Sequence, residues 1–202
     1  GEMVILSHFE PFGGDGINAS KIVAHKVADT RSDLRVIELP TVFDDAFIPL
    51  MTEIEKTAPE AIIMLGQAAG RTAVTPEKVA INWKESTKAD NNGYIARGER
   101  ISISGADAYF STLPLVEIID SLQRDGLPLS LSFTAGTFVC NYLFYRTMEY
   151  LVSTGKDFPV GFVHIPCIPQ QTVGKNGLAS MDAALSAAIL SRMIDVIVGD
   201  GR

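Results

Sequence analysis

The chain has 202 residues, of which 47% are hydrophobic and 20% are charged, and its formal net charge is −7. This composition is typical of an ordered globular protein with a sizeable core, and it lacks the basic character of nucleic-acid-binding proteins. No apolar stretch is long enough for a membrane span, and the run Met3–Leu6 is too short for the hydrophobic region of a signal peptide. We therefore expect a soluble cytoplasmic protein that binds neither nucleic acid nor membrane, with Cys140 and Cys167 as free thiols.

Strand and helix signals alternate along the chain. In chain order we expect a strand at 3–6, a glycine turn at 13–16, a helix at 19–28, a strand at 35–39, a helix at 44–56, strands at 61–65 and 79–83, a polar surface loop at 84–100, a helix at 112–122, a strand at 129–133, a helix at 137–152, a strand at 160–165 and a last helix from its N-cap Ser180 to Val198. Continuous apolar strands between helices indicate a largely parallel sheet covered on both faces. We expect one three-layer α/β/α domain over residues 1–202.

Cys140 is a candidate nucleophile. It follows a strand and a small-residue turn, and it opens a helix. The dipole and exposed N–H groups of a helix N-terminus stabilise a thiolate, and the same N–H groups could bind an oxyanion. The alternative is a buried core cysteine, because free cysteine is among the most buried residue types.

His164 is a candidate base because it ends an expected strand, and catalytic groups in open α/β sheets gather at the carboxyl ends of strands. It could also be a satisfied interior histidine. His8 ends the first strand and competes for the same role, whereas His25 lies on an expected helix and should be exposed. Glu77 precedes the strand at 79–83, where it could accept a hydrogen bond from a histidine or serve as an ordinary loop carboxylate.

Four blocks spread over nearly the whole chain carry a family resemblance. They are FEPFGGDGIN at 9–18, LGQAAGRTAVTPEKVAIN at 65–82, AGTFVCN at 135–141 and GFVHIPCIPQ at 161–170. In this order they resemble the motifs of pyroglutamyl peptidase I, also called pyrrolidone-carboxylate peptidase. The segment 109–114 also resembles a stretch of that family.

The resemblance implies a triad of Cys140, His164 and Glu77 in an α/β/α fold related to nucleoside phosphorylases, and a homotetramer. It implies a lactam pocket lined by the residues that match the family's pocket, namely Phe9, Phe12, Gln67 and Phe138. Flat rings can enclose a small uncharged lactam, while an amide or backbone group satisfies its polar edges. No cofactor is expected. No metal is expected either, because the histidines and cysteines show no ligand spacing.

Three positions depart from the family pattern. His8 stands where the family has a small residue, commonly glycine. Cys167 stands where a tyrosine is usual. Thr87 stands where the family commonly has an arginine, and Lys84 and Lys88 are nearby candidates to replace that charge.

The resulting hypothesis is a cysteine exopeptidase that removes N-terminal pyroglutamate from peptides. Cys140 would form a thioester, His164 would transfer protons and Glu77 would orient the imidazole. One alternative is a catalytically silent relative that binds a lactam or a peptide end. The other is a nucleoside phosphorylase-like enzyme, in which the glycine turn at 13–16 would bind phosphate, although no Lys-Ser or Lys-Thr follows it.

Overall fold

A five-stranded sheet forms the centre of the protein in the computed structural model, which describes residues 2–199. Its strands, from edge to edge, are β2 (Leu34–Leu39), β1 (Val4–Phe9), β3 (Ala61–Gln67), β9 (Val160–Ile165) and β4 (Thr75–Pro76). The first four are parallel, and the two-residue β4 runs antiparallel to β9. The predicted largely parallel sheet is therefore confirmed, and β4 is the strand that makes it mixed.

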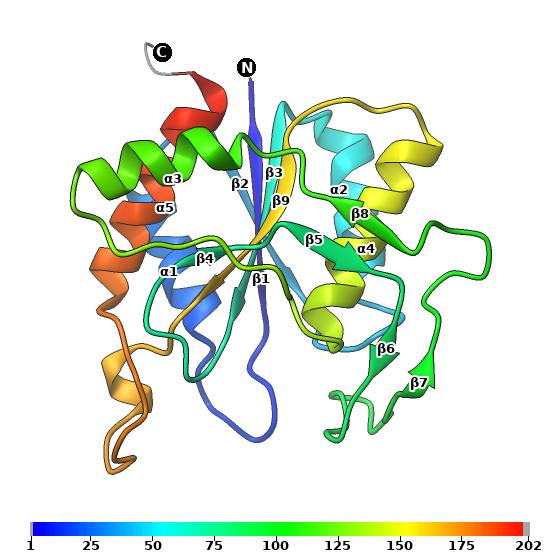
Figure 1. Ribbon diagram of the computed structural model, residues 1–202, viewed down its shortest axis with the longest axis horizontal. Helices are drawn as coiled ribbons and strands as arrows, with labels where there is room; N and C mark the ends of the chain where they lie inside the picture. The colour runs from blue at the N-terminus through cyan, green and yellow to red at the C-terminus, as the bar shows by residue number, and fades with distance from the viewer. Residues whose placement is uncertain (1, 200–202) are drawn as a thin grey trace.

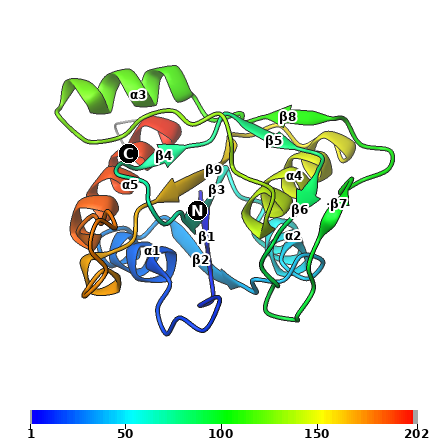
Figure 2. The ribbon, with the colours of Figure 1, turned by 60° about the horizontal axis from the view of Figure 1, so that its bottom comes forward.

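Helices cover both faces of this sheet, as Figures 1 and 2 show. On one side lie α1 (Ala19–Asp29), α3 (Leu115–Arg124) and α5 (Ala183–Val198), and on the other lie α2 (Phe47–Thr57) and α4 (Val139–Ser153). α1 and α3 pack against α5, and α2 packs against α4. The predicted three-layer α/β/α arrangement is confirmed. None of the helices within residues 2–199 has both the length and the apolar character needed to cross a membrane.

The three inner strands β1, β3 and β9 are mainly apolar because both of their faces are buried. Successive side chains of a strand point to opposite faces, so each strand contributes to two cores. Leu6, Ile63 and Val163 pack under α1 and α5. Ile5 and Phe162 pack on the other side, with α2 and α4. This is why β1, β3 and β9 appear in the sequence as continuous apolar runs rather than as alternating patterns.

Two small ribbons extend from the sheet at the side of α4. β5 (Val79–Ile81) pairs with β8 (Ala108–Phe110), and β6 (Lys84–Glu85) pairs with β7 (Arg97–Glu99). The strand expected at 79–83 is thus shorter and lies outside the central sheet. The loop expected at 84–100 contains a two-stranded ribbon at its base, because cross-strand pairing there is possible despite the polar composition.

Some element boundaries were predicted wrongly. The strand expected at 129–133 forms only isolated bridges, from Leu129 to Val74 and from Ser132 to Glu77. The last helix begins at Ala183, and its N-cap is Asp182 rather than Ser180, because the Asp182 carboxylate accepts from the amide of Ala184. The helices expected from 44, 112 and 137 begin at 47, 115 and 139. A short 3-10 helix, η1 (Pro169–Gln171), was not expected.

Candidate active site

His164 and Glu77 form a direct hydrogen bond beside the carboxyl end of the sheet. His164 lies near the end of β9, and Glu77 directly follows β4, which pairs with β9. His164 Nδ1 is 2.8 Å from Glu77 Oε2, and both side chains are buried. A carboxylate can only accept, so Nδ1 carries the proton and Nε2 keeps its lone pair for proton transfer.

Cys140 reaches this site from the first turn of α4. Its Sγ lies against Gly66 of β3, which is the register partner of His164 on β9. Parallel strands place register partners side by side with their side chains on the same face. The thiol therefore lies on the face of the sheet that carries the His164 side chain, positioned by two adjacent strands and one helix.

Burial is the largest influence on the ionisation of Cys140. It raises the pKa of the thiol to about 12, with the charge of Glu77 adding to this effect and Arg71 opposing it. This direction is opposite to the one expected for a thiol at a helix N-terminus, because desolvation penalises the charged form. Burial also lowers the pKa of His164, despite the raising effect of Glu77. The resting site therefore holds a neutral thiol beside a neutral imidazole.

The first turn of α4 offers N–H groups to an oxyanion. Phe138 is the N-cap residue, and its side chain makes no capping hydrogen bond. The first amides of a helix have no intrahelical acceptor, so those around Cys140 are free to bind a developing negative charge.

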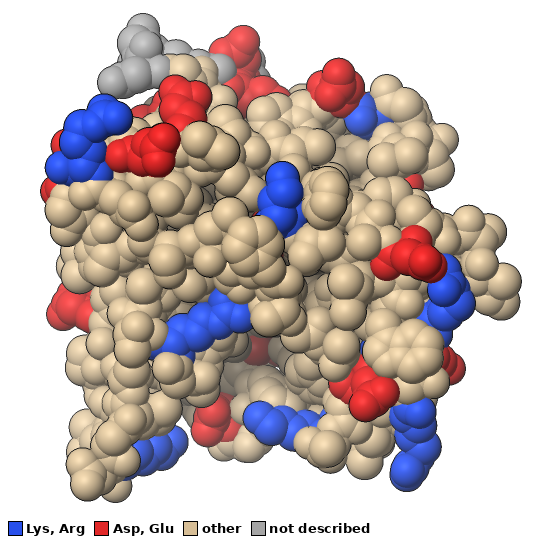
Figure 3. Space-filling view, viewed as in Figure 1, with Lys and Arg blue, Asp and Glu red and all other residues tan. Residues whose placement is uncertain are grey.

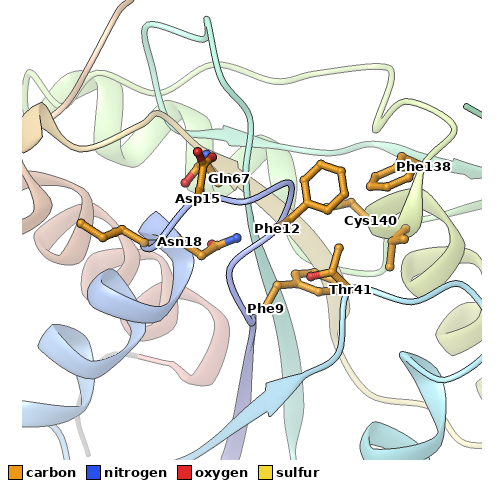
Figure 4. Close-up of a pocket in the computed structure, with 10 residues that line it drawn as sticks. Phe9, Phe12, Asp15, Asn18, Thr41, Gln67, Phe138 and Cys140 are labelled. Carbon is orange, nitrogen blue, oxygen red and sulfur yellow. The ribbon is translucent and has the colours of Figure 1, made fainter. Parts of the chain in front are cut away.

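A small cavity opens beside the thiol. Its volume is about 90 Å³, and its lining includes Cys140 together with all four expected pocket residues, Phe9, Phe12, Gln67 and Phe138. In Figure 4 the phenylalanines and Cys140 lie on one side, and Asp15, Asn18 and Gln67 lie on the other. The ring centroids of Phe12 and Phe138 are 5.0 Å apart. The cavity thus has an aromatic side next to the nucleophile and a polar side opposite.

Gln67 is held in one orientation. Its Oε1 accepts from the backbone amide of Ala19 at 2.9 Å and from Gln171 Nε2 at 2.7 Å. Because Oε1 already accepts two hydrogen bonds, the NH2 group of the Gln67 side-chain amide is the part left to donate to a ligand. Gln171 was not singled out from the sequence, and no local signal marks it, since it is 104 residues away from Gln67.

Other lining residues were also missed by sequence reasoning. They are Asp15, Ile17, Asn18, Thr41 and Val139. The sequence marks Asn18 as a helix cap rather than as a lining residue. It precedes α1 and caps it, because its side chain accepts a hydrogen bond from the amide of Ser20. Asp15 places a carboxylate in the glycine turn at 13–16, which does not suit the phosphate site that the phosphorylase alternative requires.

His8 and Cys167 lie away from the proton-transfer pair. His8 is buried, and its ring centroid is 5.3 Å from that of the exposed His25 on α1. Burial lowers the pKa of His8 to about 4, and its Nδ1 has no hydrogen-bond partner within residues 2–199. His8 is therefore not the partner of Glu77, and Cys167 is a buried free thiol.

The two lysines near Thr87 have different surroundings. Lys84 is nearly buried, 3.6 Å from Glu99, with its Nζ over the rings of Tyr94 and two other aromatic residues. Lys88 and Thr87 instead line a larger cleft of about 1170 Å³ that continues from the small cavity. Figure 3 shows the molecule hollowed at the lower edge, with charges of both signs on the rim.

The loop that holds Lys88 is tied to the cavity. Asp90 is buried and accepts from the backbone amides of Phe43 and Tyr94. Asn91 donates to Glu10 Oε1 and to the carbonyl of Pro11, next to the lining residue Phe12. Within the described part of the chain, no group of three or more histidine, cysteine or acidic side chains is arranged to hold a metal ion.

Comparisons with known proteins agree with this geometry. A family model for pyroglutamyl peptidase matches residues 2–199. The pyrrolidone-carboxylate peptidase of Streptococcus suis is 40% identical over 201 residues, covering 97% of this chain and 90% of that protein. The Bacillus subtilis protein of the same name is 38% identical over 188 residues, covering 91% and 87%.

Solved structures give the same result. Pyroglutamyl peptidase I from Bacillus amyloliquefaciens superposes with a TM-score of 0.91 at 36% identity, covering 98% of this chain and 97% of that chain. A mutant pyrrolidone carboxyl peptidase from the hyperthermophile Pyrococcus furiosus gives a TM-score of 0.90 at 32% identity, covering 97% and 98%. This chain therefore belongs to the pyroglutamyl peptidase family.

Proposed function

We propose that this chain is a cysteine exopeptidase that removes N-terminal pyroglutamate from peptides. Cys140 is the nucleophile, His164 is its base and acid, and Glu77 orients the imidazole. The observation that carries this assignment is that Cys140 lines the same small cavity as three phenylalanines. A nucleophile at the wall of an aromatic cavity can attack a carbonyl attached to a small ring bound there.

The cavity suits a single small ring. At about 90 Å³ it is far smaller than the roughly 300–1,000 Å³ typical of pockets for drug-sized ligands. Phe12 and Phe138 supply flat apolar surface, and the Gln67 amide supplies a donor for the lactam carbonyl. Pyroglutamate is uncharged, so it enters without the desolvation cost that a free N-terminal ammonium would meet against the aromatic wall.

Acylation begins from the neutral thiol and imidazole. As Sγ of Cys140 attacks the carbonyl carbon that follows the lactam ring, the thiol proton moves to Nε2 of His164. The carbonyl oxygen becomes an oxyanion, which the free amides at the start of α4 stabilise. His164 then gives its proton to the departing nitrogen, the C–N bond breaks, and a thioester remains on Cys140.

Deacylation uses the same groups in reverse order. A water molecule gives a proton to His164 as its oxygen attacks the thioester carbonyl. The tetrahedral intermediate expels the sulfur, which takes the proton back from His164, and pyroglutamic acid leaves. In both steps Glu77 keeps the ring orientation and stabilises the imidazolium while it exists.

The rest of the peptide occupies the larger cleft. This cleft shares Phe12, Asp15, Gln67 and Phe138 with the small cavity, so a chain that leaves one enters the other. An extended peptide beyond the scissile bond would lie beside Lys88 and Thr87.

A homotetramer in the cytoplasm is part of the same proposal. Phe110 and Phe133 are 64% and 69% exposed. They flank Lys78, whose backbone hydrogen-bonds to Ser111 and Ser132, the residues next to the two phenylalanines. Such exposed aromatic surface supports an interface between copies of the chain. Two free cysteines suit a reducing compartment. Sedimentation velocity tests the assembly, and cell fractionation tests the location.

Hydrolysis of a pyroglutamyl reporter amide, with and without a thiol alkylator, tests the function. Cys140→Ala should abolish turnover with the fold retained, and the matched variant Cys167→Ala should keep most of it. The same peptide beginning with glutamine should be a poor substrate. A wild-type chain that binds the reporter without turning it over would instead be a catalytically silent relative.

A further inference from the structure

Arg71 makes a close contact with the candidate triad that the mechanism above does not use. It lies in the turn after β3, and its Nη1 is 2.6 Å from Glu77 Oε2 and 2.5 Å from Thr75 Oγ1. Its Nη2 donates to the carbonyl of Thr134 at 2.9 Å. The guanidinium therefore joins the end of β4 to the segment that leads into Cys140.

Arg71 and His164 share one oxygen of Glu77. Oε2 accepts from Nη1 of Arg71 and from Nδ1 of His164, while the buried Oε1 has no hydrogen-bond partner in the described part of the chain. A carboxylate held through one oxygen can rotate unless a second contact fixes it. The planar guanidinium, anchored on Thr75 and Thr134, supplies that contact.

Arg71 also balances the charge of a fully buried carboxylate. Glu77 has no exposed surface, whereas the Arg71 side chain is 25% exposed. An unpaired buried carboxylate is costly, and the guanidinium offsets that cost. Burial lowers the pKa of His164, Glu77 raises it, and Arg71 lowers it. Removing Arg71 should therefore raise the pKa of the imidazole.

We infer that Arg71 is a positioning residue that fixes the Glu77 carboxylate against His164 and offsets its charge. The inference rests on the proposed function insofar as His164 transfers protons. The charged groups acting on His164 are Glu77 and Arg71, and the thiol of Cys140 lies against Gly66, the register partner of His164. Burial is the main cause of the lowered pKa of His164, and Arg71 acts in the same direction, favouring the neutral imidazole that accepts the thiol proton.

The test compares Arg71→Gln and Arg71→Lys with a matched control. Arg35→Gln removes a guanidinium from Glu53, another largely buried glutamate, whose contact lies at β2 and α2 and away from the site. In Arg71→Gln, kcat for the pyroglutamyl reporter should fall by roughly 10- to 100-fold, as when a catalytic group is misplaced. Arg71→Lys should recover part of kcat, and Arg35→Gln should keep the wild-type kcat.

The pH dependence separates this role from a purely structural one. The ring C–H signals of the three histidines can be followed by NMR titration, with His164 assigned through His164→Asn. The His164 midpoint should rise in Arg71→Gln, return most of the way in Arg71→Lys, and stay unchanged in Arg35→Gln. An unchanged or lowered midpoint in Arg71→Gln overturns the inference. This titration needs no turnover, so a wild-type chain inactive on the reporter would defeat the proposed function without deciding the role of Arg71.

Discussion

Gly66 leaves the space that the thiol of Cys140 occupies. A Cβ at position 66 would lie 2.9 Å from Cys140 Sγ and 2.7 Å from Cζ of Phe162. Both distances are too short for ordinary contact, and the Phe162 ring is fully buried, so it cannot move aside freely. The glycine is needed here because two side chains from different elements meet over the backbone of β3.

Gly66→Ala should therefore inactivate the protein by displacing the thiol. A displacement of about 1 Å can cost roughly 100-fold in rate, and we expect a loss of at least that size in kcat/KM for a pyroglutamyl reporter. The matched control is Gly161→Ala on β9, where a Cβ would meet Ser111 and Leu113 rather than the thiol. Gly161→Ala should lower the melting temperature while its folded fraction keeps a near-normal rate. Equal specific activities of the two variants would contradict this role of Gly66.

Because the Cys140 thiol and the His164 imidazole are both neutral at rest, we expect kcat/KM to decrease in acid only below pH 6.5. Burial holds the pKa of His164 below its ordinary value of 6.5, so the imidazole stays neutral as the pH falls through that value. Activity is lost only when the pH drops through the lowered pKa. Glu77→Gln should move this limb further down, because the carboxylate that raises the pKa of His164 is gone.

Alkylation of the free protein provides the companion measurement. Because the pKa of Cys140 is raised to about 12, the rate of reaction with iodoacetamide should keep rising up to pH 10. A plateau reached near pH 6 would reveal a preformed thiolate–imidazolium pair and contradict the neutral resting state. Cys167→Ala removes the second thiol from this measurement.

His8 predicts a loss of stability in mild acid. The folded pKa of His8 is lowered from 6.5 to about 4 by burial, with lesser effects from Glu38, His25 and Lys21. Between these values the unfolded chain binds a proton that the folded chain does not, so stability falls as the pH drops from 6.5 towards 4. At about 1.4 kcal/mol per unit, the full window corresponds to roughly 3 kcal/mol.

Urea denaturation of the wild type and of His8→Asn at pH 7 and pH 5 measures this contribution. The free energy of unfolding should fall less between the two pH values in His8→Asn, since asparagine cannot take up the proton. His25→Asn changes the exposed neighbour and should keep most of the acid sensitivity. An identical pH dependence for His8→Asn and the wild type would show that His8 is not the group responsible.

The parts of the fold that the sequence predicted well are those with a strong local signal. β1, β3 and β9 are continuous apolar runs because both faces are buried. The segment 129–133 instead alternates apolar residues with serine; it pairs only through isolated bridges, and Phe133 is largely exposed. Local β propensity is therefore not sufficient where no neighbouring strand completes the ladder.

The residues of the candidate site also differ in whether the sequence revealed them. The triad and the phenylalanines were identified through motifs that resemble a known family. Gln171 was not, because its contact with Gln67 joins segments brought together only by the fold. Arg71 lies within the motif at 65–82, but its contact with Glu77 depends on how the turn after β3 folds back. The direction of the Cys140 pKa shift was missed for a related reason. Helix position can be read locally, whereas burial depends on β3, β9 and α4 together.

The last prediction concerns the charge at position 88, in the segment where this chain departs from its family at Thr87. Lys84 is held by Glu99 and three aromatic rings, so it cannot reach a substrate, whereas Lys88 lines the cleft, 6.0 Å from the ring of Phe12. If Lys88 supplies the charge, Lys88→Ala should lower kcat/KM about fivefold, as expected for roughly 1 kcal/mol from an exposed charge. Thr87→Arg should then change little.

Lys84→Ala is the matched control. It removes a lysine from the same segment and should lower the melting temperature, because the ion pair and the contacts with the rings are lost, while the rate of the folded fraction stays near normal. A rise in kcat/KM for Thr87→Arg, together with a neutral Lys88→Ala, would show instead that the charge is missing from this chain and that arginine restores it. Unchanged rates in both would mean that this side of the cleft contributes shape and no charge to the reaction.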